Sequence, residues 1–137
     1  GPLSKEIGNN YPKNVSFLGF KEGQELKEYV KNALFTIVPS EWYENNPMTI
    51  IEAYSVGTPV LGARIGGIPE IIIEDENGYQ FESANINDLK EKIIKVDSLP
   101  VEKYEALSWG TLVFANKYLN PENYYLELMA FYKQFLK

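Results

Sequence analysis

The sequence contains no cysteine and no histidine, and it has a single arginine, Arg64, beside twelve lysines. The absence of cysteine excludes disulfide scaffolds and thiol nucleophiles, and with histidine also absent it excludes Cys/His zinc sites. Catalytic triads or dyads that depend on imidazole are excluded as well. The groups left for chemistry at neutral pH are carboxylates, lysines and tyrosines.

The chain also has too few basic residues to form a strongly cationic surface. Its formal net charge is −6. Nucleic acids and anionic membranes both require clustered cations, so we expect no nucleic-acid partner. No apolar run approaches the roughly 20 residues of a membrane span, and the start shows no signal-peptide layout. With 137 residues, 45% of them hydrophobic, the chain is large enough for one packed domain and too small for two of ordinary size.

Short β-rich runs alternate with helical patterns in the first part of the chain. The strands are predicted at residues 15–18, 34–38, 58–61 and 79–81, and the helices between them at residues 23–32 and 47–56. Strands separated by helices of about ten residues form parallel βαβ units. The pattern therefore predicts an α/β fold, with a Rossmann-like parallel sheet of about four strands and flanking helices.

From about residue 85 onward the pattern indicates helices only. They are predicted at residues 86–96, 101–118 and 121–137, the last with Asn120 as its N-cap and Pro121 as its first residue. We therefore expect a single, incomplete domain over residues 1–137. It divides into an α/β core at 1–96 and C-terminal helices at 97–137.

The segment with the most chemical information follows the strand at 34–38. A buried strand ends at Val38 and leads through a polar, aromatic loop into a helix, and parallel sheets bind ligands at such ends. The free amides around Met48 and Thr49, together with the helix dipole, favour an anion. Glu44 in the loop and Glu52 in the helix are separated by seven residues, so we expect both carboxylates to face one crevice.

Five blocks of sequence, in order and spacing, carry a resemblance to a known family. They are Pro39-Ser40 with the Glu44…Glu52 pair (E-x7-E), Gly57-Thr58-Pro59-Val60, residues 66–71, residues 77–79 and, upstream, residues 14–20. Together they resemble the retaining glycosyltransferases of family 4, in the nucleotide-sugar-binding C-terminal half of the GT-B fold. The resemblance runs in register from residue 1 to about residue 96.

The resemblance implies a role for each residue of the E-x7-E segment. Glu44 is expected to contact the donor sugar and to help stabilise charge that develops on the anomeric carbon. Glu52, as a buried carboxylate, is expected to accept hydrogen bonds from the ribose hydroxyls. The amides of Met48 and Thr49 are expected to meet the diphosphate.

Four further residues receive roles from the same resemblance. Phe20 and Lys21 are expected to border the nucleobase, largely through main-chain atoms. Gly66 and Gly67 are expected to let the backbone approach the interdomain cleft. The family is metal-independent, so we expect no metal site and no cofactor.

Several residues near the pair also have simpler interpretations. Asn46 is expected to cap the helix that Pro47 begins, and its side chain then competes with phosphate for the first amides. For Trp42 and Tyr43, packing against the loop or shielding it is favoured over binding sugar. For Arg64, a surface ion pair is favoured over a role in the cleft.

The resemblance further implies that the chain is a fragment. The family's Arg and Lys that neutralise the leaving diphosphate, two sheet strands and an N-terminal acceptor domain would all lie upstream. Residues 1–4 match the end of one of these strands, although they also fit a protease scar. Without the two strands, we expect the fragment either to pair the strands at 15–18 and 34–38 directly or to pair with a second copy through its exposed sheet strands.

The function expected from these points is donor binding in a retaining glycosyltransferase. The full-length enzyme would transfer a sugar from a nucleotide-diphosphate sugar to a glycan or lipid acceptor, which binds through the missing N-terminal domain, and the fragment would be inactive. The expected location is cytoplasmic, with the full-length protein able to lie peripherally at a membrane. One alternative is a non-catalytic α/β interaction module. Another is a GT-B sugar-nucleotide epimerase half, which the absence of histidine disfavours.

Overall fold

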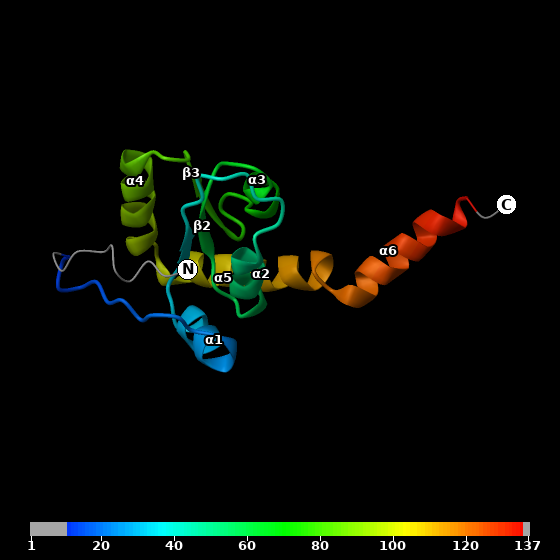
Figure 1. The fold of residues 1–137 in the computed structure, drawn as a ribbon, viewed down its shortest axis with the longest axis horizontal. Helices are drawn as coiled ribbons and strands as arrows, with labels where there is room; N and C mark the ends of the chain where they lie inside the picture. Colours follow the sequence, from blue (N-terminus) through cyan, green and yellow to red (C-terminus); the bar gives the residue numbers. More distant parts are fainter. Residues whose placement is uncertain (1–10, 136–137) are drawn as a thin grey trace.

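A computed structural model describes residues 11–135 as a small parallel sheet flanked by helices (Figure 1). In chain order the elements are α1 (Gly23–Lys31), β1 (Thr36–Val38), α2 (Met48–Ser55), β2 (Val60–Ala63), α3 (Ile68–Ile71), β3 (Gly78–Phe81), α4 (Ile86–Asp97), α5 (Val101–Tyr118) and α6 (Pro121–Lys133). The interpretation of residues 1–4 lies outside the described residues. Among those that are described, no helix combines the length and the apolar character needed to cross a bilayer.

The three strands form one sheet in the order β1-β2-β3, with both pairs parallel. Thr36 lies opposite Val60, and Leu61 lies opposite Tyr79. Each parallel connection passes through a helix, α2 between β1 and β2 and α3 between β2 and β3. The predicted α/β fold with a parallel sheet is therefore confirmed.

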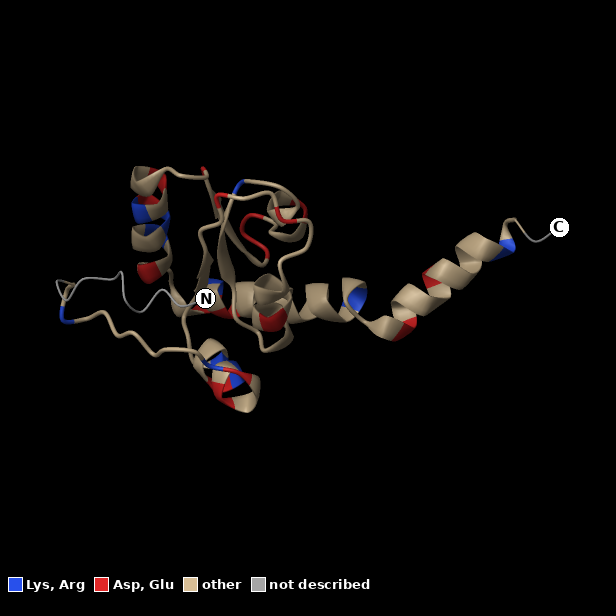
Figure 2. Cartoon of the chain, viewed as in Figure 1, with Lys and Arg blue, Asp and Glu red and all other residues tan. Residues whose placement is uncertain are grey.

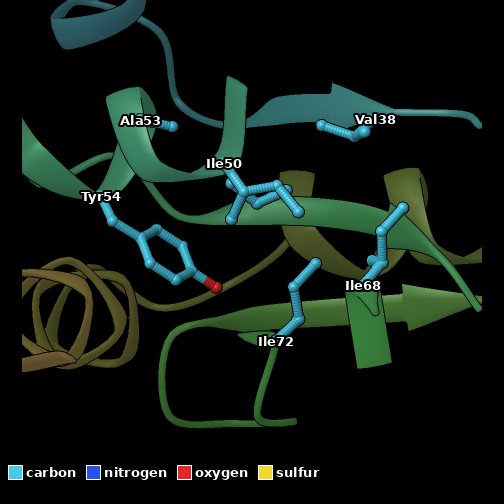
Figure 3. Packing of buried hydrophobic residues seen from close by; sticks show 7 residues of the cluster. Val38, Ile50, Ala53, Tyr54, Ile68 and Ile72 are labelled. Atoms are coloured by element: carbon cyan, nitrogen blue, oxygen red, sulfur yellow. The ribbon is translucent and has the colours of Figure 1, made fainter. Parts of the chain in front are cut away.

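The central strand β2 is buried along its whole length because a hydrophobic cluster covers each of its faces. On one face, Val60 packs with residues of α2 and α3, several of which Figure 3 shows pointing toward one another. On the other face, Leu61 and Ala63 pack with Tyr79, with Val96 of α4 and with Leu107 of α5. The alternation follows from the two-residue period of a strand.

The strand predicted at residues 15–18 is wrong. Residues 15–18 have no strand partner among the described residues, and the N–H of Val15 donates to the carbonyl of Pro12 in a turn at 3.0 Å. The predicted direct pairing with the strand at 34–38 is wrong as well, since β1 pairs only with β2 within residues 11–135. A β-rich run becomes a strand only when a neighbour satisfies its backbone groups, and none in the described part of the chain does so.

Four of the five predicted helices form with ends within one residue of the expected positions. They are α1, α2, α4 and α5. The fifth, α6, begins after its predicted cap, where the Asn120 side chain accepts a hydrogen bond from the N–H of Glu122 at 2.9 Å, and it ends earlier than predicted, at Lys133. The short helix α3 is an addition, because its four residues are too few to produce a helical period.

Helix α6 extends away from the sheet and its other helices (Figure 1), and it buries none of its residues. Its surface carries few charges (Figure 2). The apolar side chains that are more than half exposed are Tyr124, Tyr125, Leu126, Phe131 and Tyr132. By contrast, α5 packs against the body, where Leu107 and Thr111 are buried.

Candidate functional site

The loops that follow the three strands meet at one edge of the sheet. β1 leads into residues 39–47, β2 into residues 64–67 and β3 into residues 82–85. Because the strands are parallel, their carboxyl ends lie at the same edge, which is where open α/β sheets bind ligands.

Gly66 and Gly67 hold the loop that carries Glu44. The N–H of Gly67 donates to the carbonyl of Glu44 at 2.8 Å. A Cβ on Gly66 would lie 2.5 Å from that same oxygen, and a Cβ on Gly67 would lie 2.0 Å from the carbonyl oxygen of Asn45. Gly66 also has a φ of 58°, which favours glycine. The structure therefore brings three predicted site residues, Glu44, Gly66 and Gly67, into direct contact.

The Glu44 side chain is exposed, and a neighbouring hydroxyl orients it. The Oγ of Ser40 donates to Oε1 of Glu44 at 2.6 Å. The carbonyl of Ser40 in turn accepts a hydrogen bond from the Oγ of Ser83 at 3.0 Å. The loops after β1 and β3 are thereby joined beside Glu44.

Met48 and Thr49 are the first two residues of α2, and no side chain caps this helix. The prediction that Asn46 is the N-cap is wrong, because Pro47 occupies that position and has no side-chain acceptor to offer. The contact of residues 44 and 45 with the glycine loop fixes the path of the chain into the helix and overrides the capping preference of asparagine. The first amides and the positive end of the helix dipole are consequently left for an anion.

Glu52 lies on the other side of α2, next to α1. It lines a cavity of about 210 Å³ whose other lining residues are Gly23, Leu26, Lys27, Val30 and Ser55. Glu44 does not line this cavity, so the two carboxylates do not share it as predicted. The prediction of a buried Glu52 carboxylate is also wrong, since the side chain is exposed. Its place in the cavity lining shows that it faces α1.

Phe20 and Lys21 lie just before α1, next in sequence to the part of that helix that lines the Glu52 cavity. The Phe20 side chain is 86% exposed. The Lys21 ammonium forms an ion pair with Glu25, and this hydrogen bond raises the pKa of Lys21. The side chain of Lys21 therefore contacts the first turns of α1.

Three residues near the site differ from their simpler interpretations. Trp42 and Tyr43 are 81% and 87% exposed, so the interpretation that they pack against the loop is wrong. Arg64 forms no salt bridge within residues 11–135, and its Nε donates instead to Oε1 of Gln80 at 3.4 Å. The backbone N–H of Arg64 also donates to the carbonyl of Phe81 at 2.7 Å, which joins the ends of β2 and β3.

The sequence identifies Ser40 only as part of a motif and gives no role to Ser83. Their contact joins residues 43 positions apart, so no local spacing could indicate it. Residues 11–135 contain no group of three or more His, Cys, Asp or Glu side chains placed to hold a metal.

The chain is similar to several proteins of known sequence or structure. It is 37% identical over 100 residues to an uncharacterized glycosyltransferase of Methanocaldococcus jannaschii, a match that covers 70% of this chain and 28% of that protein. Its fold resembles a glycosyltransferase from Rickettsia africae, with a TM-score of 0.75 and 22% identity over 86% of this chain and 31% of that one. Anabaena HepE is similar too, with a TM-score of 0.67 and 22% identity over 76% of this chain and 28% of that one. The chain therefore spans less than a third of each of these proteins.

A family model also matches the chain. The model described as glycosyl transferases group 1 matches residues 4–111, which is more than half of the chain. The matched span contains all three strands and every residue of the site from Phe20 to Ser83. The chain belongs to the glycosyl transferases group 1 family.

Proposed function

We propose that this chain is the donor-binding part of a retaining glycosyltransferase that transfers a sugar from a nucleoside-diphosphate sugar to a glycan or lipid acceptor. The contact of the Glu44 loop with Gly67, beside the uncapped start of α2, is the observation that carries the proposal. A carboxylate and free amides at one sheet edge suit a ligand that has both hydroxyls and phosphates. Anabaena HepE, whose fold is similar, was solved in complex with UDP-glucose.

Different parts of the donor would contact different parts of this sheet edge. The diphosphate would lie at the amides of Met48 and Thr49, at the positive end of α2. The sugar would lie at Glu44. The ribose hydroxyls would donate to Glu52, and the nucleobase would lie along the main chain near Phe20 and Lys21, on the side of α2 that faces α1.

The two ends of the scissile bond acquire opposite charges during transfer. As the bond from the anomeric carbon to the diphosphate oxygen breaks, the carbon becomes more positive and takes up the oxygen of the acceptor hydroxyl. The bond electrons leave with the diphosphate, and the proton of the acceptor hydroxyl passes to the departing diphosphate oxygen. Glu44 stabilises the positive carbon, whereas the amides of Met48 and Thr49 stabilise the leaving oxygen. The family resemblance implies that an Arg and a Lys upstream of this chain would complete this second task. We therefore propose that the chain alone binds donor weakly and does not catalyse transfer.

A titration followed by NMR tests the proposal. We expect UDP and UDP-glucose to shift the amide resonances of Met48, Thr49, Gly66 and Gly67, and to leave those of α6 unchanged. Inorganic pyrophosphate serves as the control for the anion site alone, and it should affect Met48 and Thr49 but not the segment before α1. Shifts confined to other surfaces, or no shifts at millimolar UDP, would contradict the proposal and favour a non-catalytic interaction module.

A substitution of Glu52 tests the proposed contact with the ribose. Glu52→Ala should weaken UDP binding by about 1–3 kcal/mol, because the ribose hydroxyls lose a charged acceptor. Pyrophosphate has no ribose, so its affinity should not change. Glu91→Ala on α4 is the matched control, since Glu91 is an exposed glutamate that does not line the Glu52 cavity. Equal UDP affinity in wild type and Glu52→Ala would exclude this role.

We further propose that a second copy of the chain pairs with the outer edge of β1. β1 hydrogen-bonds to β2 on one side, and no strand of residues 11–135 lies on its other side. Ile37 in this strand is 40% exposed. An open strand edge presents N–H and C=O groups that another strand can satisfy.

The acceptor would bind through the N-terminal domain of the full-length enzyme.

A further inference from the structure

We propose that Ser40 is a positioning residue that fixes the carboxylate of Glu44 for the donor sugar. The inference rests on the proposed function, because it requires Glu44 to contact that sugar. Its basis is the hydrogen bond from the Oγ of Ser40 to Oε1 of Glu44, at 2.6 Å. Within residues 11–135, no other side chain donates to this carboxylate.

The position of Glu44 makes an orienting contact necessary. Glu44 is exposed, in a loop without helix or strand. The glycine loop fixes its backbone but does not restrict its side-chain torsions. Ordering a free glutamate side chain on binding costs conformational entropy. A hydroxyl that selects one arrangement in advance removes part of that cost from the binding step.

The geometry of the contact leaves the carboxylate able to bind substrate. A serine hydroxyl has one proton to donate, and here that proton goes to Oε1. The second oxygen, Oε2, stays available for a sugar hydroxyl or for the anomeric centre. Because the hydroxyl carries no charge, it does not offset the charge of the carboxylate as an arginine or lysine partner would.

Ser40 is itself held from outside its own loop. Its carbonyl accepts a hydrogen bond from the Oγ of Ser83 at 3.0 Å. Ser83 follows β3, so the ends of β1 and β3 fix Ser40, while the loop after β2 fixes the backbone of Glu44 through Gly67. All three strand ends thereby contribute to the orientation of one carboxylate.

The test compares the affinities of the 137-residue chain for UDP and for UDP-hexoses. The quantity measured is the ratio of the Kd for UDP to the Kd for the most tightly bound UDP-hexose. Ser40→Ala should reduce this ratio by up to roughly tenfold, toward the ratio of Glu44→Gln, and leave the Kd for UDP unchanged. Ser40→Thr, which keeps the hydroxyl, should restore the ratio. Ser83→Ala should lower it by a smaller factor.

Two controls separate positioning from a general effect on folding. Ser98→Ala removes a hydroxyl that bonds to backbone carbonyls at the end of α4, and it should not change the ratio. Ser40→Ala introduced into Glu44→Gln should have no further effect, because the group that Ser40 orients has already been altered. A purely structural role would lower the affinity for UDP as well.

Each outcome is decisive. If wild type and Ser40→Ala show the same ratio while Glu44→Gln lowers it, the role of Ser40 is excluded and the proposed function stands. If wild type binds UDP but no UDP-hexose more tightly, the sugar contact of Glu44 is excluded, and the role of Ser40 with it. If wild type does not bind UDP, the proposed function itself fails.

Discussion

Gly19 and Gly66 share one backbone conformation but have different surroundings. Their φ angles are 69° and 58°, both in the left-handed region. A Cβ on Gly19 would have no atom within 4 Å, whereas one on Gly66 would lie 2.5 Å from the carbonyl oxygen of Glu44. The two positions therefore separate the cost of the conformation from the cost of the close approach.

We expect Gly19→Ala and Gly66→Ala to lower the free energy of unfolding by different amounts. Both variants bear the left-handed cost of about 1–2 kcal/mol. Gly66→Ala should lose about 1–3 kcal/mol more, because the loop around Glu44 must move. Urea unfolding followed by circular dichroism gives both values. Equal losses in the two variants would mean that the glycine loop does not constrain Glu44.

Tyr79 links β3 to the turn before it. Its hydroxyl donates to Oδ1 of Asp75 at 2.9 Å. This bond lowers the pKa of Asp75, while burial and the bond together raise the pKa of Tyr79 to about 12. Because the ordinary value for tyrosine is 10.0, the Tyr79 contribution to stability is complete below pH 10 and is lost as the pH rises through about 12.

Tyr79→Phe should therefore flatten the alkaline fall of the free energy of unfolding between about pH 10 and pH 12. The Asp75 contribution depends on pH in the opposite direction. Because the fold lowers the pKa of Asp75, its contribution to the free energy of unfolding is complete above the ordinary pKa of aspartate and is lost as the pH falls. The same variant should thus also flatten the acid limb. Urea unfolding across the pH range measures both limbs. If the free energies of unfolding of wild type and Tyr79→Phe changed in parallel with pH, the bond between Tyr79 and Asp75 would not contribute to the pH dependence.

At this scale the sequence predicts the site only in part. Glu44, Gly66 and Gly67 could be proposed as site residues because each belongs to a motif with fixed spacing, and the structure places them in contact. Ser83 could not be identified from the sequence, because its role depends on a contact with Ser40, which lies 43 positions away. The exposure of Glu52 could not be predicted either, since it depends on how α1 packs against α2.

Among the elements, α2 has the most direct connection to the proposed function. Its first residue, Met48, is 61% exposed, and no side chain caps the helix. A negative charge at this position should therefore stabilise the fold and weaken the binding of an anionic ligand.

Met48→Glu should raise the free energy of unfolding by about 0.3–1 kcal/mol relative to Met48→Gln, since the carboxylate interacts favourably with the helix dipole. It should also weaken UDP and pyrophosphate binding relative to the same control, because the new charge repels phosphate. Calorimetry at two salt concentrations measures this second effect, which higher salt should reduce. Identical phosphate affinities in the two variants would argue against an anion site at α2.

Helices could be predicted more accurately than strands in this chain, for a physical reason. The ends of α4 and α5 follow from periodicity and local signals, which are present in the sequence itself. A strand depends on its partner, and residues 15–18 have a strand-like composition without one. The cap of α2 was mispredicted because contacts between residues 44–45 and the glycine loop, rather than local preference, set the entry to that helix.

At the scale of the whole molecule, the open edge of β1 makes the oligomeric state testable. We expect wild type to form dimers at high concentration, and Ile37→Lys to be monomeric, because a lysine on an edge strand opposes pairing. Ile94→Lys on α4 is the matched control, since Ile94 is also exposed, at 57%, but lies away from the sheet edge. Light scattering over a concentration series measures the mass, and a wild type that stays monomeric throughout would exclude the pairing.

The exposure of Trp42 has a consequence for spectroscopy. Trp42 and Trp109 are the two tryptophans of the chain, and both are largely exposed, at 81% and 69%. Their indole emission in the folded state should already resemble that in water, so unfolding should shift it little. Trp42 lies two residues before Glu44, so a sugar nucleotide bound there would cover its ring and move the emission to shorter wavelength. In Trp109→Phe, Trp42 is the single tryptophan, so the emission wavelength would report whether a sugar nucleotide is bound at the Glu44 loop.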